Sequence, residues 1–192
     1  MVRKIIAFSG RMHAGKDTAG EYLCNAHNFR RFAFADALKR GVQQLTGFSN
    51  EQLWGEAKDS VDDFYGITPR QVLQDIGMFM REQYTEEFWI RRFIRFANEH
   101  PNQDIVITDV RFENEVQMIK GLDGYVVRVW RPETMNEIIQ HSSETQDFDV
   151  DAVILNDSTK SELYKQIDDL LSTWYDIPPP RSLTDSRHFM DD

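Results

Sequence analysis

The sequence predicts an α/β domain built on a parallel five-stranded sheet that is flanked by helices. Short apolar runs that resemble buried strands alternate with longer segments in which apolar residues recur at helical spacing. This alternation is typical of parallel sheets whose strands are joined by helices on both faces. At 192 residues, the chain is long enough to bury a core of this kind.

The elements follow one another in a regular order. Apolar runs predict strands at residues 4–9, 29–34, 105–108, 125–130 and 152–155. Helical spacing and start signals predict helices at residues 15–26, 36–45, 68–81, 85–100, 112–120 and 159–174. Asp36, Thr68 and Thr159 are expected to cap three of these helices. We expect a single domain over residues 1–175 and an extended proline-rich tail over residues 176–192.

Composition limits the kinds of partner. The formal net charge is −10 and no basic stripe is evident, which argues against binding to a nucleic-acid backbone or to an anionic membrane. Cys24 is the only cysteine, which suits a reducing compartment. The N-terminal apolar run is too short for a signal peptide or a spanning helix. We therefore expect a cytoplasmic protein (in the host cytoplasm if its source is viral) with neither nucleic acid nor membrane as partner.

The segment from Ser9 to Thr18 reads S-G-R-M-H-A-G-K-D-T and contains the pattern G-x-x-x-x-G-K. Glycines let the backbone approach a phosphate closely, and N–H groups at a helix N-terminus point at the anion. The segment lies between the first predicted strand and the first predicted helix, as such a phosphate loop must. A chance glycine-rich turn is the alternative. We predict that ATP is bound by Met12, His13, Ala14, Gly15, Lys16, Asp17 and Thr18.

Asp17 occupies the position at which most phosphate loops carry a serine or threonine that binds magnesium. Magnesium dehydrates reluctantly and often keeps waters and substrate phosphates as ligands. We therefore predict that Asp17 positions a hydrated Mg²⁺ or orients the attacking phosphate oxygen. The alternative is that Asp17 only caps the helix.

Asp109 follows the apolar strand at residues 105–108, where a second, Walker-B-type carboxylate near the metal is expected. Many parallel strands end in aspartate for capping reasons alone. Arg111 lies two residues further on and could reach a phosphate or pair with Asp109. We predict Asp17 and Asp109 as metal ligands.

The acceptor of the phosphoryl group is expected to meet side chains of the region 36–98. Arg70 and Gln74 are four residues apart and share one helix face. Asp36 and Lys39 follow the second strand, and ligands of such sheets bind beyond the carboxyl ends of the strands. Ordinary solvated helix faces are the alternative. Arg11 and Arg111 complete the predicted acceptor contacts.

A lid is predicted at residues 131–150, because a phosphotransferase must exclude water from its phosphates. Arg131, which directly follows the fourth strand, is the predicted stabiliser of charge on the transferring phosphoryl group. Within the lid lies the segment H-S-S-E, residues 141–144, which could read a base or a sugar hydroxyl. Without other evidence, four residues of these types are more often ordinary polar residues of the protein surface.

Taken together, these motifs resemble the bacteriophage-type deoxynucleoside monophosphate kinases. The shared features are the loop ending in G-K-D-T, T-P-R at 68–70, T-D-V-R-F-E-N-E at 108–115, R-P at 131–132 and H-x-S-E at 141–144. They occur in the same order and span residues 3–173. The loop alone is shared with phosphomevalonate kinases, whereas its combination with D-V-R-F-x-N-E is more specific.

The resemblance implies a three-layer P-loop kinase fold and conversion of deoxynucleoside monophosphates to diphosphates with ATP and Mg²⁺. It also implies, in many members, a homodimer. By carry-over, Gly15, Lys16, Asp17 and Thr18 would hold ATP, and Lys39, Arg70 and Glu144 would hold the acceptor. In related kinases the residues after the fifth strand, here 156–159, hold the adenine ring. A helix cap explains these residues of the present sequence equally well.

Two other interpretations stay open at this point. A kinase for phosphomevalonate or another small phosphorylated acceptor would share the phosphate loop. An ATP-binding regulatory module would bind ATP without acceptor-stimulated release of ADP. The accepted bases, the choice between deoxyribose and ribose, and the roles of residues 47–67 and 176–192 do not follow from the sequence.

Overall fold

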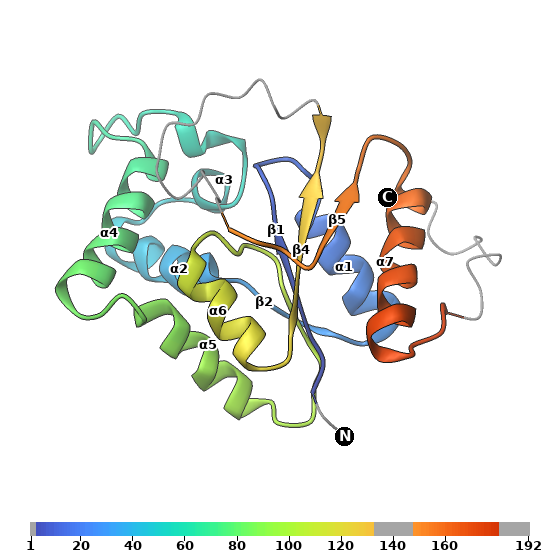
Figure 1. Ribbon diagram of the computed structural model, residues 1–192. Coiled ribbons are helices and arrows are strands. Elements are labelled where there is room, and N and C mark those ends of the chain that lie inside the picture. The colour runs from blue at the N-terminus through green and yellow to red at the C-terminus, as the bar shows by residue number, and fades with distance from the viewer. Residues whose placement is uncertain (1–2, 133–147, 181–192) are drawn as a thin grey trace. The chain divides into compact units, whose positions relative to one another are not determined.

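The computed structural model describes residues 3–132 and 148–180. The chain divides into two compact units, unit 1 with residues 1–31 and 102–192, and unit 2 with residues 32–101 (Figure 1). Unit 1 contains the phosphate loop and most of the sheet. Unit 2 is helical.

The described residues form a five-stranded sheet, as predicted. Its strands are β1 (Ile5–Ser9), β2 (Arg30–Phe32), β3 (Ile105–Ile107), β4 (Tyr125–Trp130) and β5 (Ala152–Leu155). The spatial order is β2-β3-β1-β4-β5. β1 runs parallel to both β3 and β4, and β4 runs parallel to β5. β1 is therefore the central strand, and the loop that follows it leaves from the middle of the sheet.

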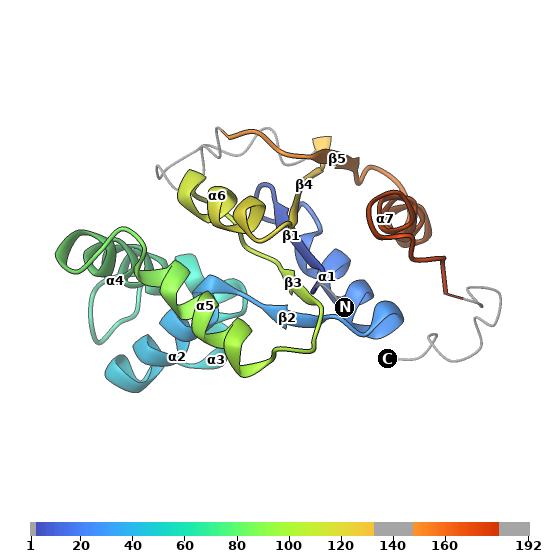
Figure 2. The same cartoon turned by 60° about the horizontal axis from the view of Figure 1, so that its bottom comes forward.

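Helices cover both faces of the sheet in unit 1. The helices are α1 (Lys16–His27), α6 (Glu113–Gly121) and α7 (Lys160–Tyr175). α6 lies on one side of β1 and β4, and α1 and α7 lie on the other (Figures 1 and 2). Side chains alternate between the faces of a strand, and Ile6 and Phe8 of β1 join the core cluster that α1 and α7 supply. The three-layer arrangement predicted from the sequence is confirmed.

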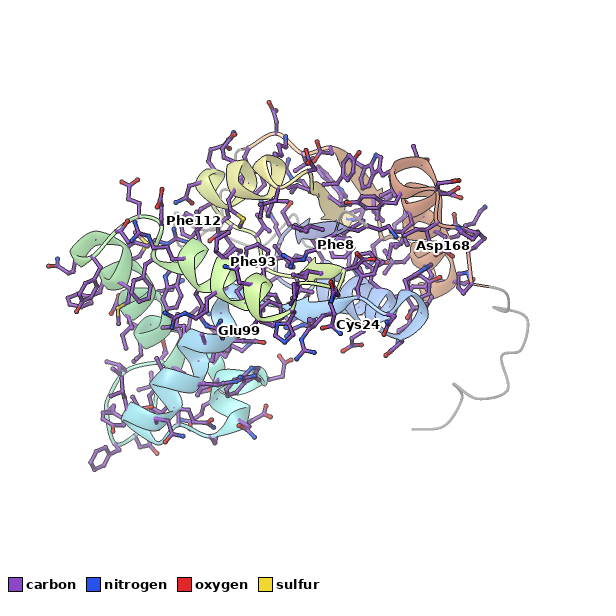
Figure 3. The ribbon with its side chains drawn as sticks, turned by 90° about the horizontal axis from the view of Figure 1, so that it is seen from below. Phe8, Cys24, Phe93, Glu99, Phe112 and Asp168 are labelled. Atoms are coloured by element: carbon purple, nitrogen blue, oxygen red, sulfur yellow. The ribbon has the colours of Figure 1, made fainter. Side chains whose placement is uncertain are left out.

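A buried polar cluster joins α1 to α7. The Tyr22 hydroxyl lies 2.9 and 2.8 Å from the two carboxylate oxygens of Asp168, and His27 Nε2 lies 2.8 Å from Oδ1. Asp168, on α7 (Figure 3), is 5% exposed. Burial, and then the hydrogen bond to Asp168, raise the pKa of Tyr22. A buried carboxylate needs such partners because its desolvation is otherwise costly, so the cluster fixes the contact between the two helices.

The C-terminal end of α7 is attached to the central strand through one side chain. The Tyr175 hydroxyl donates to the carbonyl oxygen of Ile5 at 3.0 Å and lies 3.3 Å from the Ile5 backbone nitrogen, from which it accepts. Burial raises the pKa of Tyr175 to about 12.

None of the helices in the described part of the chain is long and apolar enough to cross a membrane.

Unit 2 consists of five helical segments, which are α2 (Phe34–Thr46), α3 (Asn50–Leu53), the 3₁₀ helix η1 (Glu56–Asp59), α4 (Pro69–Gln83) and α5 (Phe88–Glu99). The predicted cap at Thr68 is confirmed, since its hydroxyl accepts from the Gln71 N–H at 3.1 Å. The predicted cap at Asp36 is wrong. α2 begins at Phe34 with Ala33 as its extended N-cap residue, which places Asp36 in the first turn.

The core of unit 2 is aromatic and aliphatic. Phe93 of α5 is fully buried and packs edge-on against Phe32, with ring centroids 5.1 Å apart. The Trp89 indole N–H donates to the Gly77 carbonyl at 3.1 Å, which fixes α5 against α4. Trp89 and Phe93 are both buried and belong to this core.

Residues 47–67, whose role the sequence leaves open, form an ordered network around short turns. The Ser49 hydroxyl caps α3 by accepting from the Gln52 N–H, and the Gln52 side-chain oxygen accepts from the Ser49 N–H. Gln52 Nε2 also donates to Asp62 at 2.8 Å. Asp62 in turn accepts from the N–H groups of Phe64 and Tyr65. Polar side chains thus organise this segment where no long helix or strand exists.

The Tyr175 contact predicts a loss of stability in alkali. A phenol with a folded-state pKa of about 12, against an ordinary 10.0, holds its proton more tightly when folded. Its contribution to the free energy of unfolding is therefore fully present below about pH 10 and is lost as the pH rises towards 12. We expect Tyr175→Phe to weaken this decline, at a cost of about 1 kcal/mol at neutral pH from the lost hydrogen bonds.

Urea unfolding at several pH values between 7 and 11 measures both effects. Tyr84→Phe is the matched control, because Tyr84 is 68% exposed. Its stability should follow the wild-type pH dependence. Equal declines above pH 10 in the wild type and in Tyr175→Phe would contradict the account.

Candidate active site

The loop between β1 and α1 has the backbone of a phosphate cradle. Gly10 and Gly15 adopt positive φ angles of 136° and 102°, and His13 has a φ of 59°. A Cβ atom on Gly10 would lie 2.4 Å from the carbonyl oxygen of Val129, so only glycine fits there. The loop leads directly into the N-terminus of α1, where N–H groups lack helical acceptors and favour an anion.

Lys16 is the first residue of α1 and folds back over the loop. Its Nζ donates to the carbonyl oxygens of Gly10 at 2.8 Å and Arg11 at 2.6 Å. The ammonium group is therefore held within the loop, beside the N–H groups of the helix terminus. This places a positive charge where the phosphates of a nucleotide are predicted to lie.

Asp17 lies in the first turn of α1, with its side chain 75% exposed. The N-cap position is Gly15, which has no side-chain capping bond. Asp17 is therefore not the N-cap residue of α1, and its role at the metal stays a prediction. The carboxylate lies 3.5 Å from Arg31 Nη2, an exposed ion pair that contributes little to stability, and the negative charge lies at the mouth of the loop.

Asp109 follows β3 and is half-buried. The next residue, Val110, donates its N–H to the carbonyl of Phe8 at 3.1 Å, which ties this strand end to β1 just before the loop. Thr108 packs close to Gly20 of α1, since a Cβ there would lie 2.4 Å from the threonine methyl group. Asp109 therefore lies between two residues that contact the end of β1 and the first turns of α1, and its role near the metal stays a prediction.

Asp17 and Asp109 suit a magnesium ion by their chemistry. Mg²⁺ is usually held by one or two carboxylates together with phosphate oxygens and waters, without a dedicated protein cage. Within residues 3–132 and 148–180, no group of three or more His, Cys, Asp or Glu side chains is arranged to hold a metal ion.

Arg111 lies at the start of α6, in a turn organised by a buried glutamate. Glu115 is 1% exposed, and its carboxylate accepts from the N–H groups of Arg111 at 2.8 Å and Phe112 at 3.2 Å. This role of Glu115 was not predicted, although its position three residues after Phe112 has the spacing of a capping residue. Glu115 thus shapes the backbone that carries Arg111.

Arg131 follows β4 directly. It therefore lies at the carboxyl ends of the strands, as the loop after β1 does, because β1 and β4 are parallel. Arg128, within β4, donates to the carbonyl of Phe148 at 2.8 Å. Most of the predicted lid, including Glu144 and the rest of H-S-S-E, lies at residues 133–147, outside the described residues.

The remaining predicted acceptor residues, Asp36, Lys39, Arg70 and Gln74, belong to unit 2. Two of them are oriented by neighbours within that unit. Lys39 Nζ lies 5.6 Å from the centroid of the Trp54 ring, within range of a cation–π interaction. Arg70 is paired with Asp59 of η1 through Nε and, at 2.9 Å, through Nη2. Asp36 lies in the first turn of α2, and Gln74 lies one turn after Arg70 on α4.

Asn156 is a residue of this region for which the sequence analysis did not foresee the contact. It follows β5, and its side-chain Nδ2 donates to the carbonyl of Ala14 in the phosphate loop at 2.9 Å. No local sequence signal announces a contact between residues 142 positions apart.

Comparison with known proteins adds to this geometry. The model of the deoxynucleotide monophosphate kinase family matches residues 51–167. A protein of Acanthamoeba polyphaga mimivirus, provisionally named a deoxynucleotide monophosphate kinase, is 33% identical over 184 residues, which cover 85% of this chain and 93% of that protein.

The chain belongs to the deoxynucleotide monophosphate kinase family. It is accordingly a kinase of the P-loop fold that acts on small nucleotides, with ATP as a substrate. Crystal structures resemble it in fold at low identity. TT1252 of Thermus thermophilus has a TM-score of 0.53 and 15% identity, over 90% of this chain and 98% of that one. Shikimate kinase of Aquifex aeolicus has a TM-score of 0.47 and 18% identity, over 88% and 95%.

The Asp59–Arg70 pair in unit 2 of this kinase predicts a measurable pKa. The guanidinium of Arg70, through its hydrogen bond, lowers the pKa of Asp59 below the ordinary 3.8. We expect Arg70→Gln to return the Asp59 pKa towards that value. Following the side-chain carboxyl carbon by NMR during an acid titration measures it.

Arg91→Gln is the control, because Arg91 is an exposed arginine of the same unit that pairs with Glu87. It should leave the Asp59 pKa where it is in the wild type. An Asp59 pKa that stays low in Arg70→Gln would show that another group causes the shift.

Proposed function

We propose that the protein transfers the γ-phosphoryl group of ATP to deoxynucleoside 5′-monophosphates and produces the diphosphates. The observation that supports this most strongly is that the chain belongs to the deoxynucleotide monophosphate kinase family. It also has the backbone of a phosphate loop. Phosphomevalonate and other small phosphorylated acceptors are the alternatives that share such a loop.

In this proposal the donor nucleotide lies along residues 10–18. The N–H groups of the loop and the N-terminus of α1 face its β- and γ-phosphates, and Lys16 exchanges its bonds to the loop carbonyls for bonds to phosphate oxygens. The exchange is favourable because a charged acceptor binds an ammonium group more strongly than a neutral carbonyl does. Asp17 and Asp109 would hold Mg²⁺, which neutralises phosphate charge when bound.

The acceptor would be held by cations of unit 2. Arg70 and Lys39 would bind its phosphate, and Asp36 and Gln74 would contact its sugar or base. The pairing of Arg70 with Asp59 holds the guanidinium in place, which reduces the side-chain entropy lost on binding. The phosphate of the acceptor would bind the Arg70 guanidinium together with the Asp59 carboxylate or in its place.

The chemical step would then need positioning more than acid–base catalysis. A phosphate monoester loses its second proton near pH 6, at roughly the value of a phosphoserine, so the attacking oxygen is already ionised at neutral pH. In-line attack would leave charge on the equatorial oxygens, and Lys16 and Arg131 would stabilise it. The segment 131–150 would exclude water as a lid.

The decisive experiment measures ADP release from Mg-ATP with each deoxynucleoside monophosphate, each ribonucleoside monophosphate and phosphomevalonate. We expect release to depend on one or more deoxynucleotides. Release with phosphomevalonate alone would transfer the assignment to that alternative. ATP binding without stimulation by any acceptor would support a regulatory module.

The same assay tests the predicted acceptor site in unit 2. Arg70→Gln should raise the KM of the accepted deoxynucleotide by about tenfold or more, as expected for a lost charged hydrogen bond, with the KM of ATP unchanged. Arg91→Gln again serves as the exposed control and should match the wild type. An unchanged acceptor KM in Arg70→Gln would remove Arg70 from the site.

A further inference from the structure

We propose that Asn156 is a positioning residue for the phosphate loop, which it orients by holding the Ala14 carbonyl. This inference rests on the proposed function only in taking residues 10–18 as the site of the donor phosphates. It gives the side chain after β5 a task different from contact with the adenine ring.

Asn156 is anchored through its backbone to the ends of two strands. It directly follows β5, and its N–H donates to the Trp130 carbonyl at the end of β4 at 2.8 Å. The two strand ends therefore fix the Cα of Asn156. From this fixed point the side-chain amide reaches the loop and donates to the Ala14 carbonyl oxygen at 2.9 Å.

Holding this carbonyl also determines the direction of an N–H group. The peptide bonds of the described residues are all trans, and in a trans peptide the C=O and the following N–H point in opposite directions. The carbonyl of Ala14 and the N–H of Gly15 belong to one peptide. Because Asn156 holds the Ala14 oxygen, the Gly15 N–H of the same peptide points away from Asn156.

The closeness of the packing supports the same role. A Cβ atom on Gly15 would lie 2.4 Å from Asn156 Nδ2, and Gly15 has a φ of 102°. The positive φ of Gly15 and its lack of a side chain together leave room for the Asn156 amide. Ala14 itself is 1% exposed, so water cannot easily replace Asn156 as the donor to this peptide.

The contact requires a side chain that can donate a hydrogen bond, which the amide of asparagine provides. An aspartate at position 156 would have nearly the same shape but would place a carboxylate oxygen against the carbonyl oxygen of Ala14. The two acceptors would repel, and the peptide would turn. An alanine would only remove the bond. We therefore expect the aspartate variant to be affected more than the alanine variant.

Binding of inorganic tripolyphosphate and of ATP, each with Mg²⁺ and measured by calorimetry, tests the inference. Asn156→Ala should weaken both ligands by the same factor, about threefold to tenfold for one hydrogen bond. Asn156→Asp should weaken both further. Asn98→Ala, at an exposed asparagine of unit 2, is the matched control and should bind as the wild type does.

The two ligands separate the possible roles. Weaker binding of ATP with unchanged binding of tripolyphosphate would show that Asn156 contacts the base, and would overturn the inference. Unchanged binding of both would also overturn it. If the wild type itself fails to bind tripolyphosphate and ATP, the failure is that of the phosphate loop, and the proposed function falls with it.

An NMR measurement distinguishes positioning from general stability. In the wild type the Gly15 amide proton should shift strongly on addition of tripolyphosphate. In Asn156→Asp that shift should shrink, while the unliganded spectrum keeps the dispersion of a folded protein. A Gly15 shift as large as that of the wild type would contradict the positioning role even if the variant were less stable.

Discussion

The close approach of bare backbone in the loop between β1 and α1 is the constraint on which the rest of the structure depends. Gly10 packs so tightly on Val129 that a side chain is excluded, and Gly15 packs in the same way on Asn156. These contacts require β4 and the turn after β5 to lie at fixed positions beside β1. The parallel sheet therefore does more than form a core, because the residues at its strand ends pack against the loop and fix its backbone.

Two kinds of interaction hold these strand ends in place. On the face covered by α1 and α7, apolar side chains such as Phe8 and Leu23 pack with the buried Tyr22–Asp168–His27 cluster. At the strand ends, backbone bonds such as that from Val110 to Phe8 set the height of each loop relative to β1. The proposed chemistry relies on this rigidity, since phosphoryl transfer gains most of its rate from positioning and electrostatics.

The sequence predicted those features that local signals encode. The strand–loop–helix order around Lys16 and the cap at Thr68 follow from residues a few positions apart, so the placement of the loop and the five-stranded sheet could be foreseen. The start of α2 could not, because Ala33 caps it without a side-chain signal and Phe34 suits a strand as well as a helix. The contact of Asn156 with Ala14 and the pairing of Asp59 with Arg70 depend on tertiary placement, which residue spacing does not encode.

The central claim is that Lys16 and the loop around it carry the phosphoryl transfer. Its most direct test compares acceptor-dependent ADP formation by the wild type and Lys16→Ala, with Lys165→Ala of α7 as an exposed lysine control. The account predicts a loss of about 100-fold or more in kcat for Lys16→Ala, as for removal of a preorganised charge-stabilising group. The unfolding midpoint and the activity of Lys165→Ala should stay close to those of the wild type. Near-normal turnover by folded Lys16→Ala would contradict the account.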